Sequence, residues 1–139
     1  MKRKVLAIAL CIVVVLLLFF ACDEWRKTTL LEDVDSTTIS KIVLEGPCST
    51  SGFTVTQQKD INKVVELVQS MKLKWKIPAA KDGYGFALEV YYKSGETDAI
   101  TLTSEDVAVN SPNFTYQCDR NYCEDFDELY KELSKESKN

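Results

Sequence analysis

The stretch INKVVELVQSMKLKWKI, residues 61–77, changes its apolar period halfway along its length. In its first part the apolar residues recur every three or four positions, which is typical of a helix with one buried face. These residues are Ile61, Val64, Val65, Val68 and Met71. From Lys72 to Ile77 basic and apolar residues alternate, which indicates a half-buried strand with Leu73, Trp75 and Ile77 on one face. The stretch therefore predicts a helix over residues 57–72, with Thr56 as its N-cap, followed directly by a strand.

Short segments on both sides of this stretch are rich in β-branched or aromatic residues, or alternate in polarity, and these patterns are typical of strands. We expect strands over residues 38–45, 53–56, 84–92, 97–103, 107–109 and 114–118. The tetrapeptide KSGE, Lys93–Glu96, predicts a hairpin turn in which Gly95 takes a positive φ. A second helix is expected over residues 123–135, with an apolar face made by Phe126, Leu129, Tyr130 and Leu133.

The predicted order of elements after the N-terminal segment is ββαβββββα. Strands that follow one another through short turns favour an antiparallel sheet over parallel βαβ units. Two amphipathic helices need an apolar surface to cover. The expected fold class is therefore α+β, an antiparallel meander sheet with both helices packed on one face, preceded by an N-terminal apolar signal or anchor helix.

The first 22 residues have the features of an export segment. Three basic residues, Lys2, Arg3 and Lys4, precede 18 residues without charge. The segment resembles the signal peptide of bacterial lipoproteins, with Ala21 before the cleavage point and Cys22 as the lipidated residue. It departs from the usual pattern at Phe19 and Phe20, so two alternatives stay open: an uncleaved single-span anchor and a cleaved soluble form.

All three alternatives place the rest of the chain outside the cytoplasm, because basic residues before an apolar segment stay on the cytoplasmic side. We therefore expect a signal peptide or membrane anchor over residues 1–22, a tether over 23–37, and a single extracytoplasmic domain over 38–139. The expected location is the cell membrane, which the protein contacts through its N-terminal segment. In pattern and length the body is similar to small uncharacterised lipoproteins of Gram-positive bacteria, a group that implies no common activity.

Charge and composition remove several classes of function. The chain has 139 residues, 17 of them basic and 21 acidic. All the acids follow Cys22, so the exported part carries a net charge of −7 and is a poor candidate for nucleic acid. There is no histidine, which removes His-based catalysis and the commonest transition-metal ligand. We expect no cofactor, no metal site and no catalytic residues, and we interpret the acids of residues 124–128 as helix N-terminal charge.

Three cysteines lie in the expected domain. Cys118 ends a predicted strand and Cys123 begins a predicted helix, so they are the favoured pair for a disulfide outside the cytoplasm. Cys48 lies in a turn cluster and competes with either of them.

A candidate binding patch is formed by Lys72, Lys74 and Lys76, with Tyr91 beside small residues on another strand. A basic stripe on an acidic domain could bind an anionic cell-envelope polymer or a protein partner. The alternative interpretation is a solvated strand face whose lysines discourage edge-to-edge aggregation.

The sequence thus favours a non-enzymatic, membrane-tethered binding domain. The alternatives are an enzyme inhibitor on a small scaffold and, less favoured, a cell-wall hydrolase that uses two carboxylates. Two buried carboxylates in one pocket would support the hydrolase.

Overall fold

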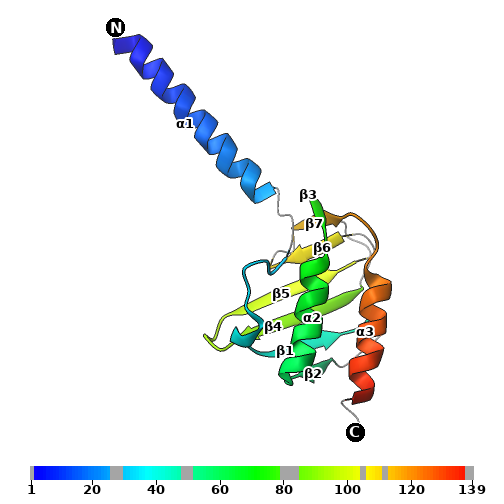
Figure 1. Cartoon of the computed structure of the whole chain (residues 1–139). Coiled ribbons are helices and arrows are strands. Elements are labelled where there is room, and N and C mark those ends of the chain that lie inside the picture. Colours follow the sequence, from blue (N-terminus) through cyan, green and yellow to red (C-terminus); the bar gives the residue numbers. More distant parts are fainter. Residues whose placement is uncertain are drawn as a thin grey trace.

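A computed structural model of the chain describes the backbone of most of its residues. The described ranges are 2–25, 30–47, 52–78, 85–103, 106–110 and 113–136. The N-terminal helix α1, Lys2–Trp25, projects away from the folded body (Figure 1). Among the described residues, no helix combines the length and the apolar character that crossing a membrane requires.

The body is a single antiparallel sheet with helices on one face, which confirms the predicted α+β class (Figure 1). Seven strands pair in the order β2-β1-β4-β5-β6-β7-β3. Their bounds are β1 Ile39–Glu45, β2 Phe53–Val55, β3 Leu73–Pro78, β4 Phe86–Tyr92, β5 Thr97–Leu102, β6 Asp106–Val109 and β7 Phe114–Cys118. Helix α2 is Gln58–Ser70, α3 is Cys123–Glu136, and a short 3-10 turn, η1 Ser36–Thr38, precedes β1. The predicted order ββαβββββα is therefore also confirmed.

The connection through α2 decides which strands form the two edges of the sheet. Strands β4 to β7 form the predicted meander, each paired with the next. Strand β1 pairs with β4 on one side and with β2 on the other. Helix α2 then carries the chain across the whole sheet, from β2 at one edge to β3 at the opposite edge, where β3 pairs with β7 (Figure 1).

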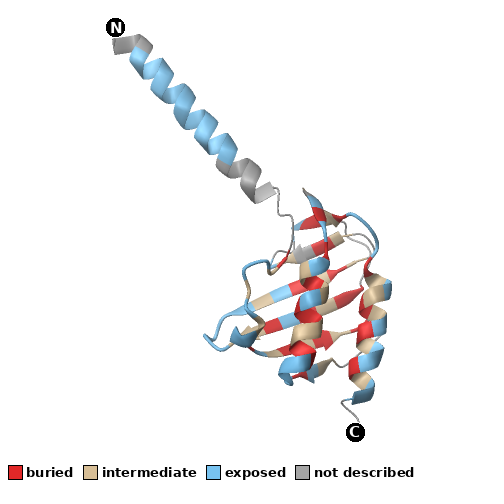
Figure 2. Ribbon diagram, viewed as in Figure 1, coloured by how far each residue is buried: buried red, intermediate tan, exposed pale blue. Residues whose placement is uncertain are grey.

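The core lies between the sheet and the two helices (Figure 2). The predicted α2 stripe is buried throughout, and so are Phe126, Leu129 and Leu133 of α3. The sheet side of this core is made by alternate residues of the strands. Its fully buried members include Ile39, Ile42, Leu44, Phe86, Leu88, Ile100 and Leu102. The other face of the sheet carries Ala87, Glu89 and Tyr91, as alternation requires.

Two local predictions have opposite outcomes. Gly95 has φ of +94° in the hairpin between β4 and β5, which confirms the predicted turn. The predicted N-cap, Thr56, is wrong, because the cap position is Gln57, whose side chain makes no capping hydrogen bond. The first turn of α2 is instead accompanied by a carboxylate, Asp60, which suits the positive end of the helix dipole.

Strand β3 contains an irregularity that the alternation of its sequence conceals. Leu73 pairs with Cys118 and Ile77 pairs with Thr115, and the register shifts between Leu73 and Lys76. Cys118 and Thr115 are three positions apart in β7, so they lie on opposite faces of the sheet. The predicted single apolar face of β3 is therefore wrong: Leu73 is buried in the core, and Ile77 is half-buried on the other face.

The folded body begins before the first strand. Leu30 is only 3% exposed within the core cluster, and Leu31 and Val34 pack against that cluster. The Nε2 of Gln69, in α2, donates to the carbonyl oxygen of Leu31 at 2.7 Å and to that of Val34 at 3.3 Å. The end of the expected tether, residues 23–37, is thus part of the packed body, and α1 extends past Cys22 to Trp25.

The register shift predicts unequal effects for two apolar truncations in β3. Leu73→Ala should lower the free energy of unfolding by about 2–5 kcal/mol, because it opens a cavity in the core. Ile77→Ala should cost about 1 kcal/mol, because this side chain lies on the face without helices. Urea unfolding of both variants measures the difference, and equal losses would contradict the shifted register.

Candidate functional site

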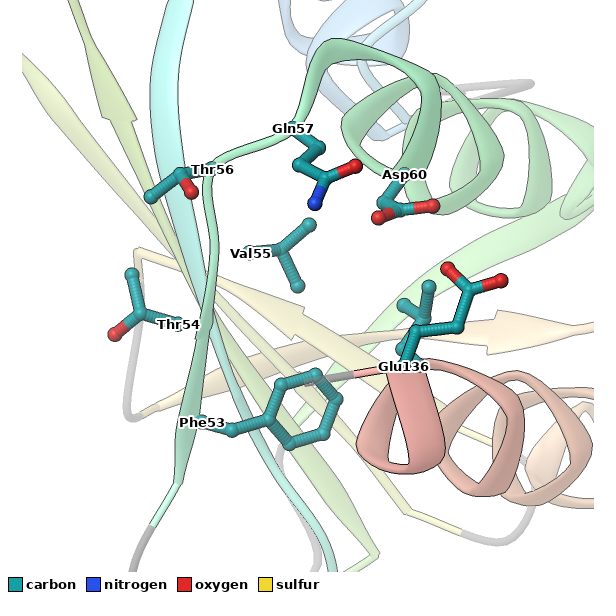
Figure 3. Close-up of a pocket in the computed structure, with 8 residues that line it drawn as sticks. Phe53, Thr54, Val55, Thr56, Gln57, Asp60 and Glu136 are labelled. Carbon is teal, nitrogen blue, oxygen red and sulfur yellow. The ribbon is translucent and has the colours of Figure 1, made fainter. Parts of the chain in front are cut away.

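A small cavity lies at the β2 edge of the sheet, and we call it the edge pocket (Figure 3). Its volume is about 160 Å³. It is lined by Phe53, Thr54, Val55, Thr56, Gln57, Asp60, Leu133 and Glu136. Strand β2 and the residues that follow it form one side, the first turn of α2 forms another, and the end of α3 closes it (Figure 3).

Chain connectivity explains why the edge pocket forms. Strand β2 is short, with three residues, and passes through Thr56 and Gln57 directly into α2. The first turn of α2 therefore starts beside β2. Because Leu133 is buried in the core, the last turns of α3 are held at the same end of the sheet.

The most unusual group in the edge pocket is the carboxylate of Asp60. The residue is 6% exposed, and its Oδ1 has no hydrogen-bond partner among the described residues. Two ammonium groups approach Oδ1, that of Lys63 at 3.6 Å and that of Lys59 at 3.9 Å. These distances are those of ion pairs and exceed a hydrogen bond. Oδ1 of Asp60 is therefore a buried acceptor atom without a hydrogen bond.

The same two lysines hydrogen-bond to α3. The Nζ of Lys63 donates to Glu132 at 2.6 Å, and the Nζ of Lys59 donates to Glu136 at 3.2 Å. The bond from Lys59 lowers the pKa of Glu136, and the bond to Glu132 raises the pKa of Lys63. Both pairs are exposed, so they contribute little to stability. The group as a whole has three carboxylates and two ammonium groups, and hence one uncompensated negative charge.

The size and exposure of the edge pocket limit its chemistry. Pockets for whole small-molecule ligands usually occupy about 300–1,000 Å³, more than is present here. The side chain of Glu136 is 43% exposed, so Asp60 and Glu136 are not a pair of buried carboxylates of the kind that a hydrolase needs. No cluster of three or more His, Cys, Asp or Glu that could hold a metal occurs within the described part of the chain. The edge pocket can accept one cationic or hydrogen-bond-donating group.

The residues of the predicted binding patch do not come together. Lys72 and Lys74 are exposed at the β3 edge, and the side chain of Lys76 lies outside the described residues. Tyr91 lies in β4, which β5, β6 and β7 separate from β3. Four strand spacings amount to about 19 Å. The structure therefore places Tyr91 apart from the lysines, and a binding role for these residues stays a prediction.

Tyr91 is already engaged by its neighbours on the face without helices. Its hydroxyl donates to Glu89 Oε2 at 2.6 Å, which raises the pKa of Tyr91. The Nζ of Lys41 lies 4.3 Å from the centre of the Tyr91 ring, a cation–π geometry. These contacts engage both the hydroxyl group and the ring face of Tyr91.

The predicted disulfide partners, Cys118 and Cys123, lie at the end of β7 and the start of α3 and are free thiols in this structure. Burial, followed by the charges of Asp106 and Asp119, raises the pKa of Cys118 to about 12. Burial also raises the pKa of Cys123, whose Sγ lies 3.4 Å from the carbonyl oxygen of Thr103. The disulfide stays a prediction. Its competitor, Cys48, lies outside the described residues, as does the side chain of Cys22, the predicted lipidation site.

The loop between these two cysteines is tied to the start of β3. The backbone N–H of Asp119 donates to the carbonyl of Lys72 at 3.0 Å, and the N–H of Lys72 donates to the hydroxyl of Tyr122 at 3.1 Å. That hydroxyl donates to Asp119 at 2.7 Å, and the Arg120 guanidinium stacks 4.1 Å from the Tyr122 ring centre. This network links the loop between Cys118 and Cys123 to the start of β3.

The edge pocket was not predicted from the sequence. Asp60 stands among polar residues at the start of a helix, and the pocket that it lines is closed by residues of α3, which comes much later in the chain. The signal available in the sequence was the position of a charged residue, Asp60, directly before Ile61, the first residue of the apolar stripe. Comparison with protein-family models, with curated proteins and with solved structures found no match.

Burial predicts an order of reactivity for the two thiols. In reduced protein at about pH 8, iodoacetamide should modify Cys123 before Cys118, because only the thiolate reacts and Cys118 is both more buried and harder to ionise. Peptide mass spectrometry over time measures both rates. Equal rates would contradict the described burial. In protein isolated without reductant, protection of both thiols that is lost on adding reductant would show the predicted disulfide.

Proposed function

We propose that this protein is a membrane-tethered, extracytoplasmic binding domain without enzymatic activity. The observation that supports the proposed membrane tether is the apolar surface of α1. Its large apolar side chains between Val5 and Phe19 are 48–74% exposed, so this helix offers a long apolar surface that the body does not cover (Figure 2). A contiguous exposed apolar surface of this kind favours a lipid environment or a removed signal segment.

Charge supports the proposed orientation. Lys2, Arg3 and Lys4 precede the apolar part of α1, and a basic start of this kind stays in the cytoplasm. The part of the chain after Cys22 has a net charge of −7 and is then exported. Attachment takes place either through a lipid on Cys22 or through α1 itself.

The edge pocket supports binding rather than catalysis. It is preformed, it contains one buried acceptor without a donor, and its volume suits part of a ligand rather than a whole substrate. Enzyme inhibition is the second candidate, since an inhibitor presents the same kind of preformed surface to its target. The exposure of Glu136 disfavours the hydrolase, which would need two buried carboxylates in one pocket.

Intact-mass analysis of the full chain extracted from membranes tests the tether. We expect either a diacylglyceryl-modified chain that begins at Cys22 or an unmodified full-length chain. The variant Cys22→Ala distinguishes the two modes of attachment. If α1 is the anchor, this variant should stay in the membrane. If a lipid on Cys22 is the anchor, this variant should carry no lipid. An unmodified chain that begins after residue 22 and is found only in the soluble fraction would overturn the proposal.

The proposed lack of enzymatic activity predicts that neither the native protein nor a carboxylate variant degrades the cell wall. Purified full-length protein should release no soluble sugar fragments from isolated cell walls, and Asp60→Asn should behave in the same way. Release by the native chain that is lost in Asp60→Asn would instead establish the hydrolase.

A further inference from the structure

We infer that the β2 edge binds an extended peptide segment of a partner protein, with one arginine or lysine side chain of that segment in the edge pocket. The inference rests on the proposed binding function and names its ligand class. It depends on four features of the structure: the free edge of β2, the position of the edge pocket beside it, the volume of that pocket and its charge.

The first feature is the edge itself. Within the described residues, β2 pairs only with β1, so one side of Phe53–Val55 offers backbone N–H and C=O groups to an added strand. The opposite edge is less suited to such an addition. Strand β3 ends in Pro78, which has no N–H to donate, and Lys74 is exposed within the strand.

The second feature is the position of the edge pocket relative to that edge. Val55 is buried on the face that the helices cover, and Phe53 packs against the core from the same face. A strand that hydrogen-bonds to β2 would lie about 4.8 Å farther out and would direct every second side chain to this face. One such side chain would enter the space between Val55, Asp60 and Glu136, which is the edge pocket (Figure 3).

The third feature is volume. The edge pocket measures about 160 Å³. A complete small-molecule ligand usually needs at least about 300 Å³. The available space therefore suits one long side chain whose backbone stays outside.

The fourth feature is charge. Lys59 and Lys63 each hydrogen-bond to a glutamate of α3, and Oδ1 of Asp60 is left without a hydrogen bond. An entering guanidinium or ammonium group would supply the missing donor and the missing positive charge. A second copy of this chain fits less well, because pairing through β2 would bring two groups of net negative charge together.

Peptide titration of the isotope-labelled full chain in nanodiscs, followed by amide chemical shifts, tests this inference. The probes are short peptides of alternating threonine and valine with a central arginine, lysine, glutamine or glutamate. We expect the arginine and lysine peptides to shift the amides of residues 53–55 and of Asp60, and to bind about tenfold tighter than the glutamine peptide. N-methylation of alternate peptide nitrogens should abolish binding, because it removes the donors of the added strand.

Asp60→Asn should reduce the preference for the basic peptides to less than about twofold, because it removes the charge that would hold the basic group. Glu66→Gln is the matched control: it makes the same change of charge on an exposed residue of the same helix and should leave the preference unchanged. Equal binding of all four peptides, no shift in β2 with any of them, or β2 shifts that come with concentration-dependent dimers would each overturn the inference. If membrane attachment persists in any of these cases, the proposed tether is still supported. Failure of the peptide-binding inference can therefore be distinguished from failure of the proposed tether.

Discussion

The sheet has one apolar face, and the need to cover that face with helices governs the rest of the fold. Helix α2 meets this need with an unbroken apolar stripe, in which Val64 and Val68 are completely buried against the strands. At about 25 cal/mol for each Å² of buried apolar surface, such side chains dominate the stability of a body of this size. The second helix, α3, completes the cover with Phe126, Leu129 and Leu133. A sheet of seven strands would otherwise expose its whole apolar side to water.

The same helix also determines where the edges of the sheet lie. Because α2 crosses the sheet from β2 to β3, these two strands become the edges although α2 alone separates them in the sequence. Its first turn meets the last turn of α3 at the β2 edge, and there the ion pairs of Lys59 and Lys63 join the two helices. The edge pocket is thus a consequence of how the core is covered. Its buried carboxylate, Asp60, lies where an apolar stripe begins and a strand has just ended.

Local patterns in the sequence were sufficient for most of the secondary structure and not for the candidate site. The α2 stripe and the Gly95 turn depend on neighbouring residues, and both were predicted correctly. The face of Ile77 depends on the pairing of β3 with β7, a strand nearly forty positions later, and no alternation of polarity could reveal the register shift. The separation of Tyr91 from Lys74 likewise depends on the strand order. The features that were not predicted thus depend on pairing between strands that are distant in the sequence.

The burial of Leu30 limits the length of chain that connects Cys22 to the folded body. Leu30 lies eight positions after Cys22, so a chain held at Cys22 could extend by at most about 28 Å before the core itself would be pulled. Attachment through α1, which ends at Trp25, would shorten this span further. The hydrogen bonds from Gln69 to Leu31 and Val34 would transmit any tension into α2. In the proposed membrane-tethered form, the body would therefore lie close to the membrane surface.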